Sequence, residues 1–480
     1  MSFISLEYIA FFVIVIPIYF IIPLRLRPIL LGIASYIFYS FTQLNYILII
    51  AFSTFIDYFI ARQIASTPED KKQSRQLLLS ISIITNLGIL FTFKYFNFFT
   101  DSINSLLVSS GNNALLQTHN LILPIGISFY TFQSMAYTID VYRGKIEAEK
   151  NLSIFATYIA FFPQLVAGPI ERASNLLPQF RQKFIIDYER IVAGLRLILW
   201  GAFKKIVIAD QLAIYVNGVY NNVNIYSGIP LILATVFFTF QIYCDFSGYS
   251  DIAIGSAKIM GFDLMENFRR PYFSRSIREF WQRWHISLST WFRDYLYIPL
   301  GGNRVSFIRN LLNLMTVFIV SGLWHGANWT FIIWGLLHGL YIVIETLIRI
   351  LCKRVKFNLP EILQVLMTFI PVVFAWIFFR ANTVNDAFYV ASNLLSISDG
   401  FSQIYQPLTS QSVDKELVGA LLALILMLLI IEWFQQKPYW MTLLRQKTKL
   451  RWAIYYSAVI FIYISIALAP TNQQFIYFQF

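Results

Sequence analysis

The stretch FWQRWHISLSTWFRDYLYIPLGGNR (Phe280–Arg304), with SGLWHGANWTFIIWG (Ser321–Gly335) shortly after it, differs from the rest of the chain. It holds His285 and His325, two of the four histidines, and six of the eleven tryptophans. Arginines and glycines are frequent in it, whereas the flanking sequence is largely apolar. The pattern indicates an apolar scaffold that carries its chemistry in this one stretch.

The composition is that of a membrane protein. Of the 480 residues, 57% are apolar and only 13% are charged, and the mean hydropathy is +0.61. Apolar runs of about 20 residues, the length of a helix that crosses a bilayer, recur throughout. The first run, 8–24, leads into more apolar sequence without a small-residue cleavage site, so we expect no signal peptide. The sequence predicts an all-α polytopic membrane protein with one integral domain, 1–480, and a catalytic stretch at about 240–340.

The net charge of +12 admits two explanations, nucleic-acid binding or cytoplasmic loops rich in Lys and Arg. In a membrane protein the loops suffice, so we expect no nucleic-acid partner. Cys244 and Cys352 lie in or beside apolar segments, which predicts neither a disulfide framework nor a metal site.

Eleven or twelve membrane helices are expected, together with re-entrant or interfacial helices. Basic residues cluster in alternate connections: Arg25 and Arg27 lie in the first, whereas segments 100–120 and 216–228 contain no Lys or Arg. Because basic loops stay in the cytoplasm, both termini are predicted to be extracytoplasmic. The spans are predicted at about 6–24, 28–42, 46–65, 77–99, 121–141, 191–215, 229–258, 306–324, 329–350, 361–380, 416–434 and 451–469.

Segment 152–190 breaks this alternation. Its apolar run is long enough to cross but is interrupted at Pro163, Gly168 and Pro169. A full crossing would invert the charge rule for everything that follows, so we interpret the segment as re-entrant. An ordinary span is the alternative.

Acidic residues also occur within the apolar runs, where an unpaired charge is costly. Asp245 and Asp251 lie in one predicted span, six residues apart, which places them on different sides of a helix. Either is expected to pair with a basic group such as the arginines of 269–283; an ion pair that holds helices together and a catalytic role both remain open. Asp57 and Glu432 are interpreted as interfacial.

The segment from Met265 to Arg309 is predicted to face the cytoplasm. It is basic and aromatic, which suits either a phosphate-bearing donor or acidic lipid headgroups, and the sequence favours neither. Its arginines include Arg278 and Arg283, our candidates for the donor side.

His325 lies in a glycine-rich turn between two apolar runs. A neutral imidazole is suited to general-base chemistry, and Gly322 and Gly326 allow backbone to approach a substrate closely. The alternative is a histidine that caps a helix. His285, in the same stretch, favours the catalytic reading, whereas His338 is interpreted as structural and His119 as solvated.

These residues carry a resemblance to the membrane-bound O-acyltransferase family, in its bacterial branch of alginate O-acetylation proteins and peptidoglycan O-acetyltransferases. The matching segments follow the family order and cover much of the chain. They are Gly168–Phe180, Tyr243–Tyr272, Phe280–Arg304, Leu323–Gly339 and the terminal FIYFQF of Phe475–Phe480.

The resemblance implies a ring of tilted helices around a central funnel that enters from outside. His325 matches the essential family histidine at the floor of the funnel, and His285 matches the second one. Further pocket candidates are Trp324, Asn328 and Asp245. The apolar run between the two histidines is expected to be a span that separates a donor side, with His285, from an acceptor side, with His325.

The implied reaction moves an acetyl group from acetyl-CoA in the cytoplasm, without a metal, to an acceptor handled outside. The implied partners are membrane lipid, an extracytoplasmic acetyltransferase and, indirectly, a polysaccharide acceptor. The implied location is the bacterial inner membrane. Tyr477 is predicted to receive the acyl group and pass it on, as an activated hydroxyl would; an aromatic anchor at the membrane surface is the alternative.

Two other functions are compatible with parts of the sequence. D-alanyl transfer to teichoic acid is the alternative within the family, and the FIYFQF ending and the chain length argue against it. A transporter or flippase would also explain polar groups within the membrane, but it predicts internal repeats, which we do not find. The acceptor polymer stays open among alginate-like exopolysaccharide, cellulose and peptidoglycan.

Overall fold

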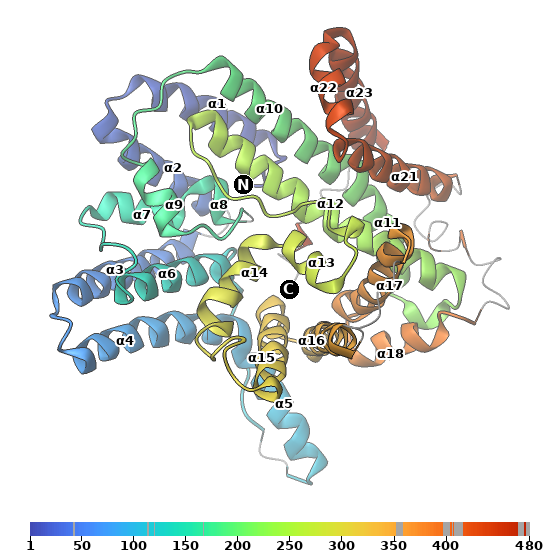
Figure 1. Ribbon diagram of the computed structural model, residues 1–480, viewed down its shortest axis with the longest axis horizontal. Coiled ribbons are helices and arrows are strands. Elements are labelled where there is room, and N and C mark those ends of the chain that lie inside the picture. The colour runs from blue at the N-terminus through green and yellow to red at the C-terminus, as the bar shows by residue number, and fades with distance from the viewer. Residues whose placement is uncertain are drawn as a thin grey trace. The chain divides into compact units, whose positions relative to one another are not determined.

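The computed structural model describes the whole chain except residues 42–43, 113–114, 120, 167, 352–358, 397–403, 406, 408–415, 469–474 and 477–480. The described residues form helices and connecting turns, with no strand among them (Figure 1). The predicted all-α class is therefore confirmed. Contacts within the chain define two compact units, one of residues 1–198 and 252–266 and the other of residues 199–251 and 267–480.

Eight described helices are long and apolar enough to cross a membrane, namely Leu44–Ser66, Lys72–Ser109, Ile229–Met260, Phe307–His325, Trp329–Leu351, Glu361–Arg380, Leu417–Gln435 and Thr448–Ala467. Helices also lie at the other predicted spans. They are shorter, as with α1 (Leu6–Ile21), α2 (Arg27–Ser40) and α6 (Ile127–Tyr142), or interrupted, as between α10 (Tyr188–Ala202) and α11 (Asp210–Tyr220).

In the first unit, α3 (Ile47–Ser66), α4 (Lys72–Leu90) and α6 pack around a polar centre. Asp57 is fully buried there and accepts hydrogen bonds from Ser82, Ser134 and Asn86. The interfacial assignment of Asp57 is wrong, because side chains from two neighbouring helices solvate its carboxylate in the interior. Helix α4 continues through a π-helical turn, η3 (Phe91–Tyr95), into α5 (Phe96–Ser109).

Segment 152–190 contains three short helices before α10 begins. They are α7 (Leu152–Ala160), α8 (Phe162–Leu165) and α9 (Ala173–Gln179). The breaks fall at the prolines and glycine that suggested an interrupted segment. None of the three is long enough to span a bilayer.

The second unit contains most of the long apolar helices. From α10 the chain passes through a second π-helical turn, η4 (Phe203–Ala209), and α11 to α12 (Ile229–Met260), whose last third belongs to the first unit. The short helices α13 (Ile277–Arg283) and α14 (Ile286–Phe292) follow, and then the π-helical turn η7 (Arg293–Tyr297). The remaining helices are α15 (Phe307–His325), α16 (Trp329–Leu351), α17 (Glu361–Arg380), α18 (Val384–Asn393), α21 (Leu417–Gln435), α22 (Pro438–Gln446) and α23 (Thr448–Leu468).

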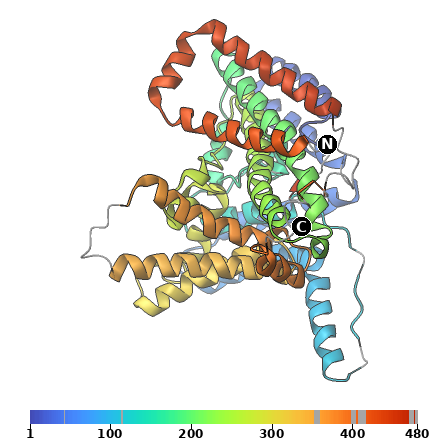
Figure 2. The same ribbon diagram turned by 90° about the vertical axis from the view of Figure 1, so that its right-hand side faces the viewer.

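Helices α15 and α16 form a hairpin that packs along its length (Figures 1 and 2). Two glycines allow this contact. A Cβ added at Gly322 would lie 2.2 Å from the carbonyl oxygen of Phe331, and one added at Gly335 would lie 2.3 Å from that of Phe318. Small residues at such crossings let helix backbones approach closely within a membrane.

Candidate active site

His325 is the last residue of α15 and is only 3% exposed. Its backbone leads into Gly326, where a Cβ would lie 2.1 Å from the ring of Phe331. The glycine-rich turn therefore lets the chain reverse tightly enough to hold His325 inside the protein.

His285 occupies a strained position between α13 and α14. Its φ is 42° and its ψ is 55°, which is a left-handed conformation. Among the described non-glycine residues, only Arg270 also has a positive φ. Such conformations persist where the surroundings enforce them, and they are frequent at functional sites. Here Asn267 supplies the support: its carbonyl accepts the Ile286 N–H at 2.9 Å, and its side-chain oxygen accepts the Ser287 hydroxyl at 3.0 Å.

The two histidines lie side by side. Their ring centroids are 6.2 Å apart, and Trp324 contacts both, at 6.0 Å from His285 and 5.0 Å from His325. Trp334 and Phe379 cover the far side of His325, at 5.0 and 5.4 Å. The sequence singled out both histidines as site candidates, and the structure brings them into one aromatic cage.

This geometry corrects the expected separation of the histidines. We expected a membrane span between His285 and His325, but His285 lies level with the end of α15 at which His325 stands. The turns after His285 carry the chain away, and α15 brings it back. The span exists, but it does not place the two histidines on opposite sides.

Burial sets the protonation state of His285. The residue is fully buried, and desolvation of the charged form lowers its pKa to about 3. A neutral imidazole accepts a proton at one ring nitrogen and donates at the other, which suits either proton transfer or the orientation of a polar substrate.

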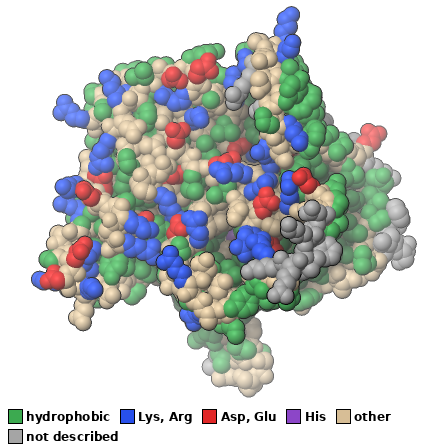
Figure 3. Space-filling view, viewed as in Figure 1, with side chains coloured by type: hydrophobic (Ala, Val, Ile, Leu, Met, Phe, Trp, Pro, Cys, Tyr) green, Lys and Arg blue, Asp and Glu red, His purple; other side chains and the backbone are tan. Residues whose placement is uncertain are grey.

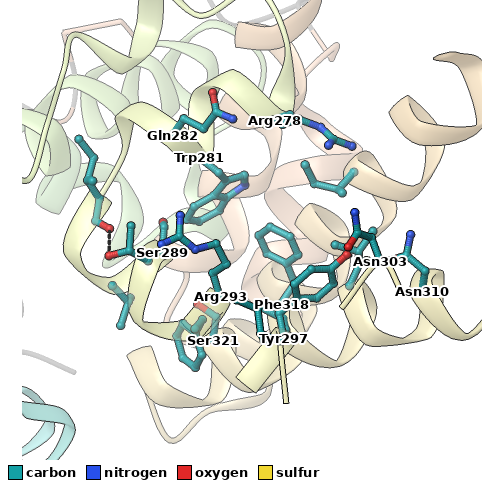
Figure 4. A pocket seen from close by; sticks show the side chains of 18 of the residues that line it. Arg278, Trp281, Gln282, Ser289, Arg293, Tyr297, Asn303, Asn310, Phe318 and Ser321 are labelled. Atoms are coloured by element: carbon teal, nitrogen blue, oxygen red, sulfur yellow. Dashed lines mark hydrogen bonds between the residues drawn. The ribbon is translucent and has the colours of Figure 1, made fainter. Parts of the chain in front are cut away.

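A cavity of about 780 Å³ opens beside this cage (Figure 4). Along α15 it is lined by one stripe that ends at Ser321, one helical turn before His325. Arg278 and Arg293 lie at its wall, together with the amides of Gln282, Asn303 and Asn310. Lys and Arg side chains are frequent on the surface over α13 and α14 (Figure 3). The cavity therefore combines cationic and amide groups with an apolar floor of Trp281, Leu314, Val317 and Phe318.

The other predicted pocket residues have different places. Arg283 pairs with Glu279 on its own helix and does not line the cavity. The Asn328 carboxamide accepts the Thr330 N–H at 3.0 Å and donates to the Asn382 carbonyl at 3.1 Å, so it caps the start of α16. His338 is fully buried, separated from His325 by Trp334, which lies 4.9 Å from it.

Asp245 and Asp251 each pair with a basic group, as expected, but the pairs that the structure shows are with lysines rather than with the arginines of 269–283. Two adjacent lysines in η4 bind them: Lys205 lies 2.6 Å from Asp245 and Lys204 lies 2.7 Å from Asp251. Glu432, interpreted as interfacial, is likewise buried and accepts the Tyr243 hydroxyl. The lysine pair stood in the apolar run AFKKIVIAD, where two buried cations require partners, so the signal was present in the sequence.

Sequence reasoning also missed Asn267, which holds His285, and Phe246, whose ring meets that of His285 edge-on at 4.6 Å. Both depend on contacts between distant segments. Tyr477 lies outside the described residues. Among the residues that the structure describes, no group of three or more His, Cys, Asp or Glu side chains is placed to hold a metal.

Across the described residues, the helical architecture with eight candidate spans is that of a multi-pass membrane protein, and it encloses a buried pair of histidines. The profile of the membrane-bound O-acyltransferase family matches residues 33–385. The chain belongs to this family, and it is therefore a membrane enzyme that transfers acyl groups to oxygen.

Its relatives include enzymes that modify bacterial polymers. It is 42% identical over 381 residues to a protein of Azotobacter vinelandii named probable alginate O-acetylase AlgI, covering 79% of this chain and 75% of the relative. It is 36% identical over 394 residues to the peptidoglycan O-acetyltransferase of Helicobacter pylori, covering 77% and 73%. The teichoic acid D-alanyltransferase of Streptococcus thermophilus is 29% identical over 255 residues, covering 48% and 58%.

Proposed function

We propose that this enzyme passes an acetyl group from a cytoplasmic donor across the membrane for O-acetylation of an extracytoplasmic polysaccharide. The observation that carries the proposal is the buried pair of His285 and His325, 6.2 Å apart, beside a cavity that reaches Ser321. The curated relatives named for O-acetylation support acetyl as the group transferred.

His325 is proposed as the general base. It takes the proton of an acceptor hydroxyl, the oxygen forms a bond to the acetyl carbonyl carbon, and the carbon–sulfur bond of the donor thioester breaks to release a thiol. The leaving thiolate is protonated by the imidazolium that has formed. Enclosure by Trp324, Trp334 and Phe379 excludes water, which would otherwise hydrolyse the thioester.

His285 is proposed as an assistant to His325. Its low pKa keeps it neutral. A neutral ring offers a hydrogen bond to the carbonyl oxygen as negative charge develops there, without presenting a fixed cation to the donor. Its strained backbone, held by Asn267, fixes the direction of that hydrogen bond.

Acetyl-CoA is the proposed donor, and the cavity is its proposed site. Arg278 and Arg293 suit phosphate groups, and the apolar side chains along α15 suit the arm that carries the thioester. No metal takes part. The proposed orientation places this cavity on the cytoplasmic side of the inner membrane and both termini outside.

On the outer side, Tyr477 is the proposed first acceptor, from which an extracytoplasmic acetyltransferase moves the group to the polymer. Alginate-like exopolysaccharide, cellulose and peptidoglycan all supply hydroxyl acceptors. The alternative is D-alanyl transfer to teichoic acid, which one group of relatives performs, by name, at lower identity and coverage. Acetyl-CoA turnover by the purified protein would favour acetyl transfer; turnover only with a carrier-bound D-alanyl thioester would favour the alternative.

Replacement of the proposed base tests the function. His325→Ala should abolish acetylation of the polymer, by at least about a hundredfold, because general-base catalysis contributes on that order. The matched control is His338→Ala, a second buried histidine that contacts the opposite side of Trp334. Both proteins are checked for insertion and accumulation in membranes. Normal acetylation by a well-accumulated His325→Ala protein would refute the assignment.

A further inference from the structure

Five ionisable side chains lie together where η4 and α11 pack against α12. Lys205 bridges two carboxylates, with Nζ 2.6 Å from Asp245 and 2.7 Å from Asp210. Lys204 binds Asp251 at 2.7 Å and the Ser247 hydroxyl at 2.8 Å. Both lysines, Asp210 and Asp245 are at most 5% exposed. We name this set the charge cluster.

Close packing of the helices makes the charge cluster possible. Gly248 stands between the two carboxylates on α12, and a Cβ there would lie 2.7 Å from the carbonyl oxygen of Gly201. The lysines therefore reach α12 without extending past intervening side chains. The cluster holds two cations and three carboxylates, so one carboxylate needs donors of another kind.

The remaining donor comes from far along the chain. The backbone N–H of Ile476 donates to Oδ2 of Asp245 at 2.7 Å, while Oδ1 of the same carboxylate faces Lys205. This bond is buried and joins residues 231 positions apart. A hydrogen bond to a carboxylate that an ammonium group holds in place is among the stronger ones in proteins.

The residue before Ile476 is anchored on the same helix. Phe475 is fully buried, with its ring 4.3 Å from that of Tyr249 and 5.8 Å from that of Phe246. Phe246 is also the ring that meets His285 at 4.6 Å. One turn of α12 thus contacts both the segment Phe475–Ile476 and the histidine cage.

We propose that Asp245, held by Lys205, is a positioning residue that docks the segment Phe475–Ile476 beside the active site. The dock fixes the chain at the residue directly before Tyr477, which deepens the proposed function in which Tyr477 accepts the acyl group. Lys205 orients the carboxylate, Asp245 binds the backbone, and Phe475 fills the adjoining aromatic pocket.

The test measures docking without relying on catalysis. Ile476→Cys, in a Cys352→Ser background, keeps the backbone N–H and places a thiol where the native side chain is 3% exposed; Cys244 is buried and stays. The rate of labelling by a water-soluble maleimide is then measured on the purified protein. Adding Asp245→Ala should raise this rate at least about tenfold, the factor that matches loss of a hydrogen bond to a charged group. Asp245→Asn, which keeps an acceptor oxygen, should raise it less.

Asp251→Ala is the matched control. It breaks the ion pair of the other α12 carboxylate, 2.7 Å long against 2.6 Å for Asp245, and leaves the Ile476–Asp245 hydrogen bond in place. If Asp245→Ala and Asp251→Ala raise labelling equally, or neither raises it, the cluster only supports the helices and the proposal is overturned. Size-exclusion chromatography identifies misfolded variants, which are left out of the comparison. If Asp245→Ala does not accumulate, Asp245→Asn replaces it in the labelling experiment.

Acetylation is measured with the same Asp245 variants, with Ile476 intact. Faster labelling together with reduced acetylation supports both the dock and the role of Tyr477. Faster labelling with unchanged acetylation supports the dock and refutes Tyr477 as the acceptor. Unchanged labelling overturns the dock, whatever the acetylation level.

Discussion

At the scale of single residues, the active site depends on groups that the interior holds in costly states. Burial keeps His285 uncharged, and hydrogen bonds from Ile286 and Ser287 to Asn267 support its left-handed backbone conformation. The sequence drew attention to His285 and His325 because the chain has only four histidines and these two share one stretch. Asn267 could not be recognised in the same way, since asparagines are common and its role arises only when 267 and 286–287 meet.

The buried state of His285 predicts how stability depends on pH. Its folded pKa of about 3 lies below the ordinary 6.5, so the unfolded chain takes up the proton first as the pH falls, and stability declines below about 6.5. His285→Gln removes this contribution. Between about pH 7.5 and 5 the variant should lose about 2 kcal/mol less than the wild type. Thermal unfolding in detergent measures the difference.

His119→Gln is the control for that measurement, because His119 is exposed in a loop of the other unit. An equal loss of stability on acidification in the wild type and in His285→Gln would contradict the prediction.

At the scale of elements, the position of His325 depends on how closely α15 and α16 approach. The apolar runs predicted these two helices well. The predicted spans at 306–324 and 329–350 differ from α15 and α16 by no more than one residue at each end. The apolar runs did not predict which basic side chains pair with Asp245 and Asp251. Helical periodicity places Asp245 and Asp251 on α12, but which helix faces them depends on the Gly201–Gly248 contact, which is tertiary. The expected separation of His285 from His325 failed for a similar reason, because the chain that leaves His285 returns along α15 to the same place.

Gly335→Ala should push α15 and α16 apart, because the added Cβ would lie 2.3 Å from a backbone oxygen that cannot rotate away. We expect a loss of stability of about 1–3 kcal/mol, together with reduced acetylation as His325 shifts in its cage. Gly419→Ala on α21 is the matched control, since nothing lies within 4 Å of its added Cβ. A Gly335→Ala protein as stable and active as Gly419→Ala would show that the hairpin tolerates the wider spacing.

At the scale of the whole molecule, membrane insertion fixes which reactant approaches from which side. The all-α class and the family followed from composition and motifs, whereas orientation rests on the distribution of Lys and Arg. The proposed orientation predicts that Ser110→Cys, in a loop without Lys or Arg, reacts with an impermeant maleimide in intact cells. Glu69→Cys, in a basic connection, should react only after the cells are opened; both positions are exposed. The reverse pattern would invert the proposed direction of transfer.

If the cavity along α15 holds the donor, as proposed, its length sets the distance that the donor must bridge. From Asn310 to Ser321 its lining residues span eleven positions of one helix, which is about 16 Å at the rise of an α-helix. A donor whose charged end binds near Asn310 brings its acyl group to the histidines only if an arm of about 16 Å joins its charged end to its acyl group. Truncated thioesters would therefore fall short of His325 even when they enter the groove. Donor choice is then a matter of reach as much as of chemistry.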